Sequence, residues 1–377
     1  MRPREPETPA GRSVLLFLCG DVMLGRGIDQ ILPYPGDPCL HEAHMRSALE
    51  YVRLAETANG VVPRTVPFDY VWGDALPELA RAQPQARIVN LETSVTKSGA
   101  HLAKGINYKM SPENIGVLTA AAIDCCVLAN NHVLDFGRDG LIETLDTLRR
   151  AGIKTAGAGC DLVEAQAPAI IGLKGGARVQ VFALGHRSSG IPRDWAARVD
   201  IPGVDLIADF SDRTLTGLAE RARSARQAGD LLIASLHWGS NWGYEIGHAE
   251  RSFARGLVDL GFDVVHGHSS HHPKAIEVYR DRLILYGCGD FVNDYEGISG
   301  HAEYRGDLSL MYLPRLCTAT GRLIDLRLVP FKIARLELKR ASIADAAWLQ
   351  ERLDVQSRPL GVGLALDNDG ALSVYWR

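Results

Sequence analysis

Six short apolar runs recur along the chain, and each is followed at once by residue types that bind metals or transfer protons. Runs of this length, bounded by polar residues, predict buried strands. They cover residues 14–19, 86–91, 125–129, 179–184, 231–236 and 262–265.

Amphipathic stretches between these runs predict helices over residues 141–151, 214–228 and 251–260, the first and last of which stop at a glycine. Strands that alternate with helices are typical of an α/β fold built from βαβ units. After residue 275 the pattern changes to paired strands, so we expect the second half to be more antiparallel, as in a layered sandwich with helices outside. Those strands cover residues 275–279, 282–286, 307–313 and 322–331.

The order of the predicted strands and helices along the chain also indicates the expected domains. We expect a disordered tail at residues 1–12, a main domain at 13–335 and a C-terminal α+β extension at 336–377. Residues 33–84 form a long insertion rich in proline and aromatic residues, which predicts a lid or a binding loop. A second irregular segment covers residues 186–203.

Composition narrows the possible partners and the location. The chain is 46% hydrophobic and 23% charged, as soluble globular proteins are. A net charge of −4 gives no reason to expect a nucleic-acid partner. The apolar runs are too short for a signal peptide or a membrane span. We therefore expect a cytoplasmic protein without a membrane partner, and the sequence leaves its oligomeric state open.

The polar residues after the runs predict one site, because the carboxyl ends of the strands in an open α/β sheet share an edge. Asp21 follows the first run and is either a metal ligand or a turn residue. Glu92 follows the second, where a buried carboxylate needs a salt bridge or a metal. Together with histidine and asparagine, these carboxylates suit Zn, Mn or Fe better than Ca.

Three residues after the third run form the clearest catalytic motif. Asn131 offers an oxygen ligand, His132 beside it is a candidate general acid or base, and Asp135 has the spacing to orient the imidazole. The alternative is a capped helix start before Gly140.

Four histidines within residues 266–272 are the most specific metal signal. His266 precedes Gly267 and is expected to point away from the site. We expect His268 to bind metal together with His271 or His272, of which His271 is preferred.

Two further loops carry candidate substrate-binding or proton-transfer groups. The loop after His237 contains Trp238 and Trp242, which either line a pocket or pack as a corner. The loop after residues 282–286 contains further polar residues, for which a plain polar loop is the alternative. They are Asp290, Asn293, Asp294, Tyr295 and Glu296.

These motifs, in this order and spacing, resemble those of the CapA-like family, known for poly-γ-glutamate capsule synthesis and similar in fold to calcineurin-like metallophosphoesterases. The resemblance runs from about residue 14 to 331. Its motifs are Gly20-Asp21, Asn90-Leu91-Glu92, Asn130-Asn131-His132, His237-Trp238-Gly239, Gly267-His268 and Gly289-Asp290-Phe291.

The resemblance implies a four-layer αββα sandwich with His132 in the catalytic position. It implies one or two divalent metals, such as Mn, Zn, Fe or Co, with Mg or Ca as further options. The implied ligands are Asp21, Glu92, Asn131, His237, His268 and His271.

Three departures from the phosphoesterase pattern weaken an ordinary phosphatase interpretation. Met23 stands where that pattern has a histidine, and Glu92 replaces an aspartate. The Gly-His-x-His motif is longer by one residue, at residues 267–271.

Members of this family also resemble lasso-peptide epimerases, so the favoured hypothesis is a metal-dependent peptide epimerase that removes and returns an α-proton. A metal would polarise the adjacent carbonyl group, with His132 and a second group exchanging the proton. Candidates for the second group are His186, Asp290, Asp294 and Glu296.

The alternatives are a metal-dependent hydrolase of a phosphoester or of a poly-γ-glutamate amide, and a non-catalytic scaffold. In the favoured hypothesis the substrate is a peptide or glutamyl-type chain. Basic and aromatic residues in the two irregular segments and the site loops are expected to hold it, in part by its carboxylate. They are Arg26, His41, His44, Arg64, Tyr70, His186, Arg187, Arg193, Trp238, Trp242 and Tyr295.

Overall fold

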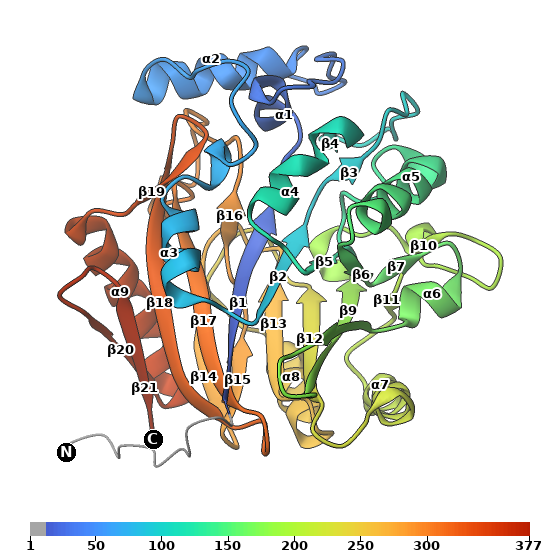
Figure 1. The fold of residues 1–377 in the computed structure, drawn as a ribbon, viewed down its shortest axis with the longest axis vertical. Coiled ribbons are helices and arrows are strands. Elements are labelled where there is room, and N and C mark those ends of the chain that lie inside the picture. The colour runs from blue at the N-terminus through green and yellow to red at the C-terminus, as the bar shows by residue number, and fades with distance from the viewer. Residues whose placement is uncertain (1–12) are drawn as a thin grey trace.

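A computed structural model describes residues 13–377, and two β-sheets dominate it (Figure 1). The strands of the larger sheet are β1 (Ser13–Val22), β2 (Ala86–Leu91), β5 (Cys125–Val127), β6 (Lys154–Ala156), β16 (Asp290–Val292), β17 (Leu308–Cys317), β18 (Leu323–Ala334), β19 (Glu337–Arg340), β20 (Val362–Leu366) and β21 (Leu372–Trp376). Their order is β20-β21-β18-β17-β1-β2-β5-β6, with β16 beside β1 and β19 beside β18.

The second sheet contains β8 (Ala169–Gly172), β9 (Arg178–His186), β11 (Leu206–Ile207), β12 (Leu231–His237), β13 (Val264–His268), β14 (Ile276–Tyr279) and β15 (Arg282–Leu285). Its order is β11-β9-β12-β13-β15-β14, with β8 beside β9. Two small sheets pair β3 (Ser94–Val95) with β4 (Lys109–Met110) and β7 (Ala158–Gly159) with β10 (Gly203–Val204). All six expected strands are present.

Alternating side chains show that the second sheet is covered on both faces. Along β9, Val179 and Val181 join the core shared with the larger sheet, whereas Phe182 and Leu184 join a second core. Successive side chains in a strand point to opposite faces, so this sheet lies between two apolar layers. The second core is closed by α7 (Asp212–Ala225) and α8 (His248–Asp259).

Helices also pack on the larger sheet, which completes the four-layer αββα sandwich and confirms the expected fold class. They are α3 (Ala75–Ala82), α4 (Gly116–Ala120), α5 (Gly137–Arg150) and α9 (Ile343–Ser357), and α6 (Leu162–Gln166) lies beside β7. Within residues 13–377, none of the helices is both long and apolar enough to cross a membrane.

The insertion at residues 33–84 is more ordered than a loop. It contains α2 (Ala48–Asn59), which contacts α1 (Gly27–Ile31), and α3, which buries Ala75 and Leu79 in the main core. Only part of it therefore lies near the strand ends. The C-terminal hairpin β20–β21 extends the larger sheet through β18, and the tail at 1–12 lies outside the described residues.

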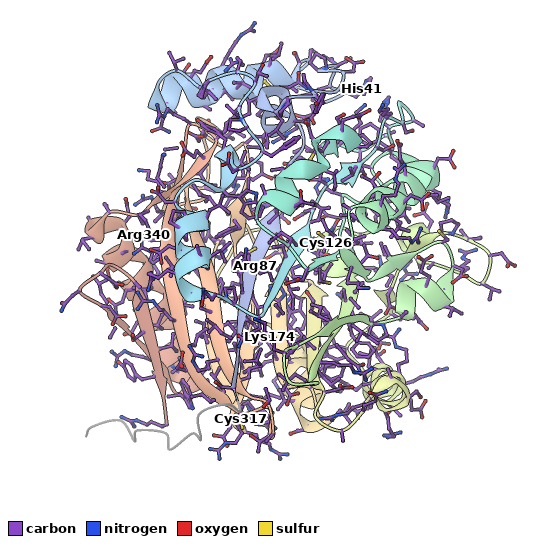
Figure 2. The ribbon with its side chains drawn as sticks, in the orientation of Figure 1. His41, Arg87, Cys126, Lys174, Cys317 and Arg340 are labelled. Carbon is purple, nitrogen blue, oxygen red and sulfur yellow. The ribbon has the colours of Figure 1, made fainter. Side chains whose placement is uncertain are left out.

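The carboxyl ends of β1, β2, β12 and β13 point to the upper end of the molecule, where α1 and α2 lie (Figure 1). His41 of the insertion is at this end and Cys317 is at the opposite one (Figure 2). The convergence of these strand ends positions the site.

Gly20 allows β1 to approach the turn before β16 very closely. The backbone N–H of Asp21 donates to the carbonyl of Gly289 at 3.0 Å. A Cβ atom on Gly20 would lie 1.6 Å from that carbonyl oxygen, so any side chain there forces two backbones apart.

We therefore expect Gly20→Ala to lower the free energy of unfolding by about 1–3 kcal/mol or more, because overpacking against a backbone cannot relax by rotating a side chain. Gly172→Ala, in a strand where the new Cβ meets nothing within 4 Å, should stay within about 0.5 kcal/mol of wild type. Urea denaturation of both variants measures this. Equal stabilities would contradict the close approach.

Candidate metal centre

Asp21 lies at the centre of the converging strand ends and is fully buried. In the sheet it stands opposite Asn90 of β2 and Asp290 of β16. Its Oδ1 accepts a hydrogen bond from Asn90 Nδ2 at 2.7 Å, and its Oδ2 accepts one from the backbone N–H of Ser269 at 3.1 Å. Both sheets thus hold the same carboxylate.

Two groups of candidate ligands share Asp21. The first joins it to His237 and His268, and the second joins it to His271 and Asp290, with the ligand atoms of each group within 4.8 Å of one another. His237 and His268 are direct partners across β12 and β13, and their Nδ1 atoms are 2.8 Å apart. From the sequence Asp290 is a candidate for substrate binding or proton transfer, and its position makes it a candidate ligand as well.

Asn131 and Glu92 complete the surroundings of the first group. Asn131 Oδ1 is 3.0 Å from His237 Nε2, and Glu92 Oε1 is 3.8 Å from the same nitrogen. Among the described residues no N–H or O–H group donates to Glu92 Oε2, which is buried. Besides burial, the charge of the Asp21 carboxylate acts on Glu92 and raises its pKa, and two ionised carboxylates in one buried site need a proton or a cation to neutralise them.

The donor set therefore fits a divalent transition metal. It combines carboxylate, amide and imidazole donors, and it includes an orphaned buried oxygen that a cation would satisfy. Burial, followed by the charge of Asp290, raises the pKa of Asp21 to about 7. Burial and Asp21 likewise raise the pKa of Glu92.

His132 lies beside this group with its ring orientation fixed. Its Nδ1 is 2.6 Å from Asp135 Oδ2, and its Nε2 is 3.7 Å from Glu92 Oε1. Burial lowers the pKa of His132 to about 4 despite the opposing effect of Asp135. The imidazole is therefore neutral at pH 7, with Nδ1–H held by Asp135 and Nε2 free to take a proton.

Two residues to which the sequence assigned no role hold this turn. Lys104 Nζ lies 2.7 Å from Asp135 Oδ1 and 2.5 Å from the carbonyl oxygen of Asn131. Asn130 Oδ1 accepts from the backbone N–H groups of His132 and Val133 at 3.1 and 3.0 Å. An Asn at a strand end is a signal for such a turn, whereas Lys104 carries no sequence signal.

The structure brings His271, not His272, to Asp21. His271 Nδ1 is 2.9 Å from Asp290 Oδ1. Burial alone would lower the pKa of His271, but the charge and hydrogen bond of Asp290 outweigh it and raise that pKa. His272 instead stacks on Tyr304 with 4.6 Å between ring centroids.

His266 does not point away from the site, which corrects the expectation. Its Nε2 donates to the carbonyl of Cys19 at 2.7 Å, and both His266 and His268 contact Ser235 Oγ. Residues two apart in a strand share a face, so the two rings lie on the same side of β13.

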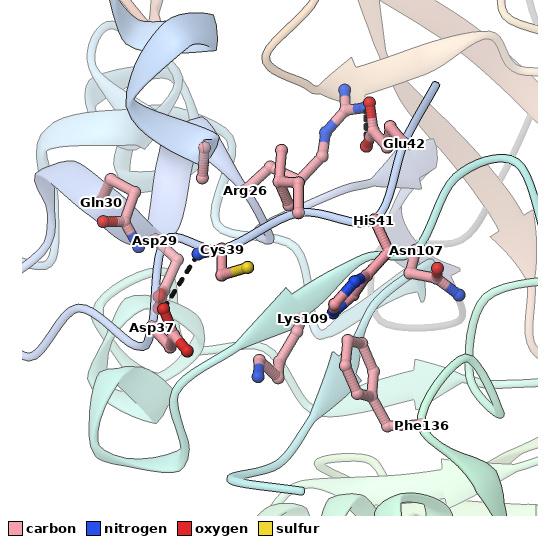
Figure 3. A pocket seen from close by; sticks show the side chains of 12 residues that line it. Arg26, Asp29, Gln30, Asp37, Cys39, His41, Glu42, Asn107, Lys109 and Phe136 are labelled. Atoms are coloured by element: carbon pink, nitrogen blue, oxygen red, sulfur yellow. Dashed lines mark hydrogen bonds and ion pairs between the residues drawn. The ribbon is translucent and has the colours of Figure 1, made fainter. Parts of the chain in front are cut away.

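Arg26, Asp294 and Glu296 serve other contacts. Arg26 forms ion pairs with Asp294 and Glu42 while stacking over the ring of Tyr51 at 3.8 Å. Figure 3 shows Arg26 and Glu42 together at a small pocket, which Asn107, Lys109 and Phe136 also line. The guanidinium is thus already paired with carboxylates of the protein, which argues against Arg26 as the residue that binds a substrate carboxylate.

Glu296 lies with the insertion and the β18–β19 turn. Its carboxylate accepts from Asn59 Nδ2 at 2.6 Å and from the backbone N–H groups of Arg335 and Leu336 at 2.8 and 2.5 Å. These contacts use both carboxylate oxygens of Glu296 within the protein, so Glu296 is not proposed as the second proton-transfer group.

Of the aromatic candidates, Trp242 and Tyr295 lie beside the site. Their ring centroids are 5.3 and 5.4 Å from that of His271. The hydroxyls of Tyr295 and Tyr108 are 2.7 Å apart. Trp238 instead packs in the second core and donates to the carbonyl of Tyr286, so it forms a corner.

The segment after β9 flanks the site. Ser189 Oγ donates to the carbonyl of His237 at 3.0 Å, and Lys104 Nζ lies 5.3 Å from the ring centroid of Trp195. His186 packs on Phe210 at 4.1 Å, whereas Arg187 and Arg193, like Arg198, are exposed in this segment.

The candidate substrate-binding residues of the insertion do not form one group. His41 stacks on His101 at 3.5 Å, and His44 is exposed. Arg64 pairs with Glu56, and the Tyr70 hydroxyl donates to the carbonyl of Arg335. These last two are therefore tied to contacts within the insertion and at the β18–β19 turn.

Comparison with known proteins decides the family. Residues 15–295 match the family described as "Bacterial capsule synthesis protein PGA_cap". The chain belongs to this CapA-like family. It is 46% identical over 363 residues to a probable polyglutamine synthesis accessory protein of Mycobacterium tuberculosis, covering 96% of both chains.

A more distant relative fits the same family. The PGA biosynthesis protein CapA of Bacillus subtilis is 28% identical over 278 residues, covering 73% of this chain and 62% of that protein. The solved structure of a 5'-nucleotidase precursor from Thermus thermophilus has a TM-score of 0.46 and 12% identity, covering 92% of this chain and 59% of that one. At that distance the likeness does not bear on activity.

We expect His268→Ala to weaken Mn²⁺ or Zn²⁺ binding by more than about tenfold, since even supporting residues of metal ligands contribute 10–100-fold. His272→Ala is the matched control, because it also removes a buried imidazole from the same segment but one that faces the aromatic rings. Isothermal titration calorimetry on both purified variants measures the affinities. Equal loss in the two variants would contradict the ligand assignment.

The raised pKa of Asp21 predicts a pH effect on the metal-free protein. Its folded-state pKa of about 7 exceeds the unfolded value of about 4, so the folded state binds more protons between these values and stability falls as pH rises through them. Metal binding needs the deprotonated carboxylate, so affinity should rise over the same range.

Thermal unfolding from pH 4.5 to 7.5, with and without Mn²⁺, checks this. We expect the metal-free midpoint to decline over that range, the metal to restore it most at the upper end, and Asp21→Asn to flatten the metal-free decline. The same slope in Asp21→Asn as in wild type would assign the effect to another group.

Proposed function

We propose that this chain is a metal-dependent enzyme that acts on a peptide or glutamyl-type substrate, and that it epimerises a residue by removing and returning an α-proton. The names of its relatives, which refer to polyglutamine synthesis and PGA biosynthesis, support the substrate class.

One observation carries the choice of reaction. Two histidine–carboxylate pairs flank Asp21 and Glu92: His132 with Asp135 at 2.6 Å, and His271 with Asp290 at 2.9 Å. Two such pairs at one centre are what a two-base proton exchange needs, because one group must accept the proton and the other must donate one.

In this mechanism His132 Nε2 takes the α-proton while Asp135 holds its Nδ1–H. The electron pair of the broken C–H bond moves into the adjacent carbonyl group, and His271 delivers a proton to the other face of the carbon. A divalent ion bound near Asp21, His237 and His268 supplies, when present, the positive charge that polarises that carbonyl. Arg187 and Arg193, exposed in the segment after β9, are suited to hold a substrate carboxylate.

Hydrolysis is the second candidate, and the second ligand group favours it. If His271 and Asp290 hold a second metal with Asp21, they no longer exchange protons, and His132 acts as the acid for a leaving group. Metal stoichiometry therefore separates the candidates: one ion fits epimerisation and two fit hydrolysis. A non-catalytic scaffold would have no need of the His132–Asp135 pair, so we do not favour that alternative.

The deciding experiment incubates the Mn²⁺-loaded protein with α- and γ-linked glutamyl peptides in D₂O. Epimerisation predicts a mass gain of one unit per turnover with the peptide intact and a D-residue on chiral analysis. Shorter peptides without deuterium would reject it in favour of hydrolysis.

His132→Ala should retain metal content and thermal midpoint while losing about 10²–10⁴-fold in rate, which is typical of a general acid or base. His248→Ala, which changes an exposed histidine at the start of α8, serves as the control. Full activity of His132→Ala, or its loss of metal, would reject the catalytic role.

A further inference from the structure

Ser235 and His266 form a buried chain of hydrogen bonds behind His268. His266 Nε2 lies 2.7 Å from the carbonyl oxygen of Cys19, its Nδ1 lies 3.1 Å from Ser235 Oγ, and Ser235 Oγ lies 2.9 Å from His268 Nε2. His266, Ser235 and His268 are at most 1% exposed. Neither Ser235 nor His266 belongs to the ligand groups around Asp21 or to the two histidine–carboxylate pairs.

The direction of every bond in this chain follows from its first member. A backbone carbonyl can only accept, so His266 Nε2 carries a proton and donates it to Cys19. Neither partner of His266 is a carboxylate, and a buried imidazolium without an anion is very costly. His266 is therefore neutral, and its Nδ1 is a bare acceptor.

That acceptor fixes the remaining two bonds. The single hydroxyl proton of Ser235 points to His266 Nδ1, so Ser235 Oγ can only accept from His268. His268 must then carry its proton on Nε2. Its Nδ1 then carries no proton and can only accept or bind a cation; it lies 2.8 Å from His237 Nδ1 and 3.9 Å from Asp21 Oδ1.

We infer that Ser235 and His266 are positioning residues that lock His268 in the Nε2–H tautomer and so present its Nδ1 lone pair to a metal ion beside Asp21. This deepens the proposed function by naming the residues that orient one metal ligand. It also gives the second histidine of β13 a role other than metal binding. Because His266 donates its one proton to the Cys19 carbonyl of β1, its other nitrogen can only accept, and this fixes the direction of the bonds from Ser235 and His268.

The direct test is the tautomer of His268 in the metal-free wild-type protein. Two-bond ¹H–¹⁵N spectra of ¹⁵N-histidine-labelled protein distinguish the two tautomers, and the signal absent from His268→Asn assigns His268. We expect the Nε2–H form at pH 7.5, with the Nδ1 resonance shifting on addition of Zn²⁺. An Nδ1–H form would overturn the inference without any variant having to fold.

The second test measures Zn²⁺ affinity. We expect Ser235→Ala to lower it 10–100-fold, as removal of supporting hydrogen bonds to metal ligands does. Ser309→Ala is the matched control, since it removes another fully buried serine hydroxyl, which donates to the carbonyl of Phe291 at 3.0 Å. Its affinity should equal that of wild type.

The outcomes separate this inference from the proposed function. Wild-type protein that binds no metal contradicts both. If wild-type protein binds metal normally and Ser235→Ala binds it with equal affinity, only the positioning role of Ser235 and His266 is overturned. Peptide epimerisation in D₂O is then unaffected. Equal losses in Ser235→Ala and Ser309→Ala would also overturn it, because a general effect on packing would explain them.

Discussion

The burial of the Asp21 carboxylate between two sheets is the constraint on which the rest of the site depends. A carboxylate removed from water is stable only when neutralised, hydrogen-bonded or paired with a cation. Asn90 and the backbone of Ser269 satisfy part of this need, while Glu92 and Asp290 increase it by adding negative charge. His237, His268 and His271 lie around Asp21, so a cation bound among them would neutralise these carboxylates.

The same contacts join the two halves of the fold. His266 of the second sheet donates to the carbonyl of Cys19 in the larger one, and Ser269 reaches Asp21 from β13's end. Gly20 lets β1 approach the turn before β16 closely enough to place Asp21 opposite Asp290. The site is therefore part of the packing between the sheets, and its geometry is set by strand register.

The surroundings of the centre explain how the departures from the phosphoesterase pattern are accommodated. Met23, at the position of a histidine in that pattern, is buried under the hydroxyl of Tyr295. Tyr295 in turn bonds Tyr108, whose ring meets His132 edge-on at 4.4 Å. Arg26 stacks over the ring of Tyr108 and is held there by ion pairs with Asp294 and with Glu42 of the insertion. A packed aromatic layer thus replaces one potential ligand.

The sequence by itself determined the six site strands, the α/β class and the family, because buried strands and their polar ends leave strong local patterns. It also singled out Asp21, Asn131, His132 and His268, because carboxylate, amide and imidazole side chains at strand ends are typical of metal ligands and proton-transfer groups. Only the tertiary structure separated His271 from His272, placed Asp290 beside Asp21 and tied Glu296 to the β18–β19 turn. It also revealed the contacts of Lys104 and Asn130 with the His132 turn and the hydrogen bonds that join Ser235 and His266 to His268. These depend on contacts between residues distant in sequence, such as Cys19 with His266, and no local pattern records which distant atoms will meet.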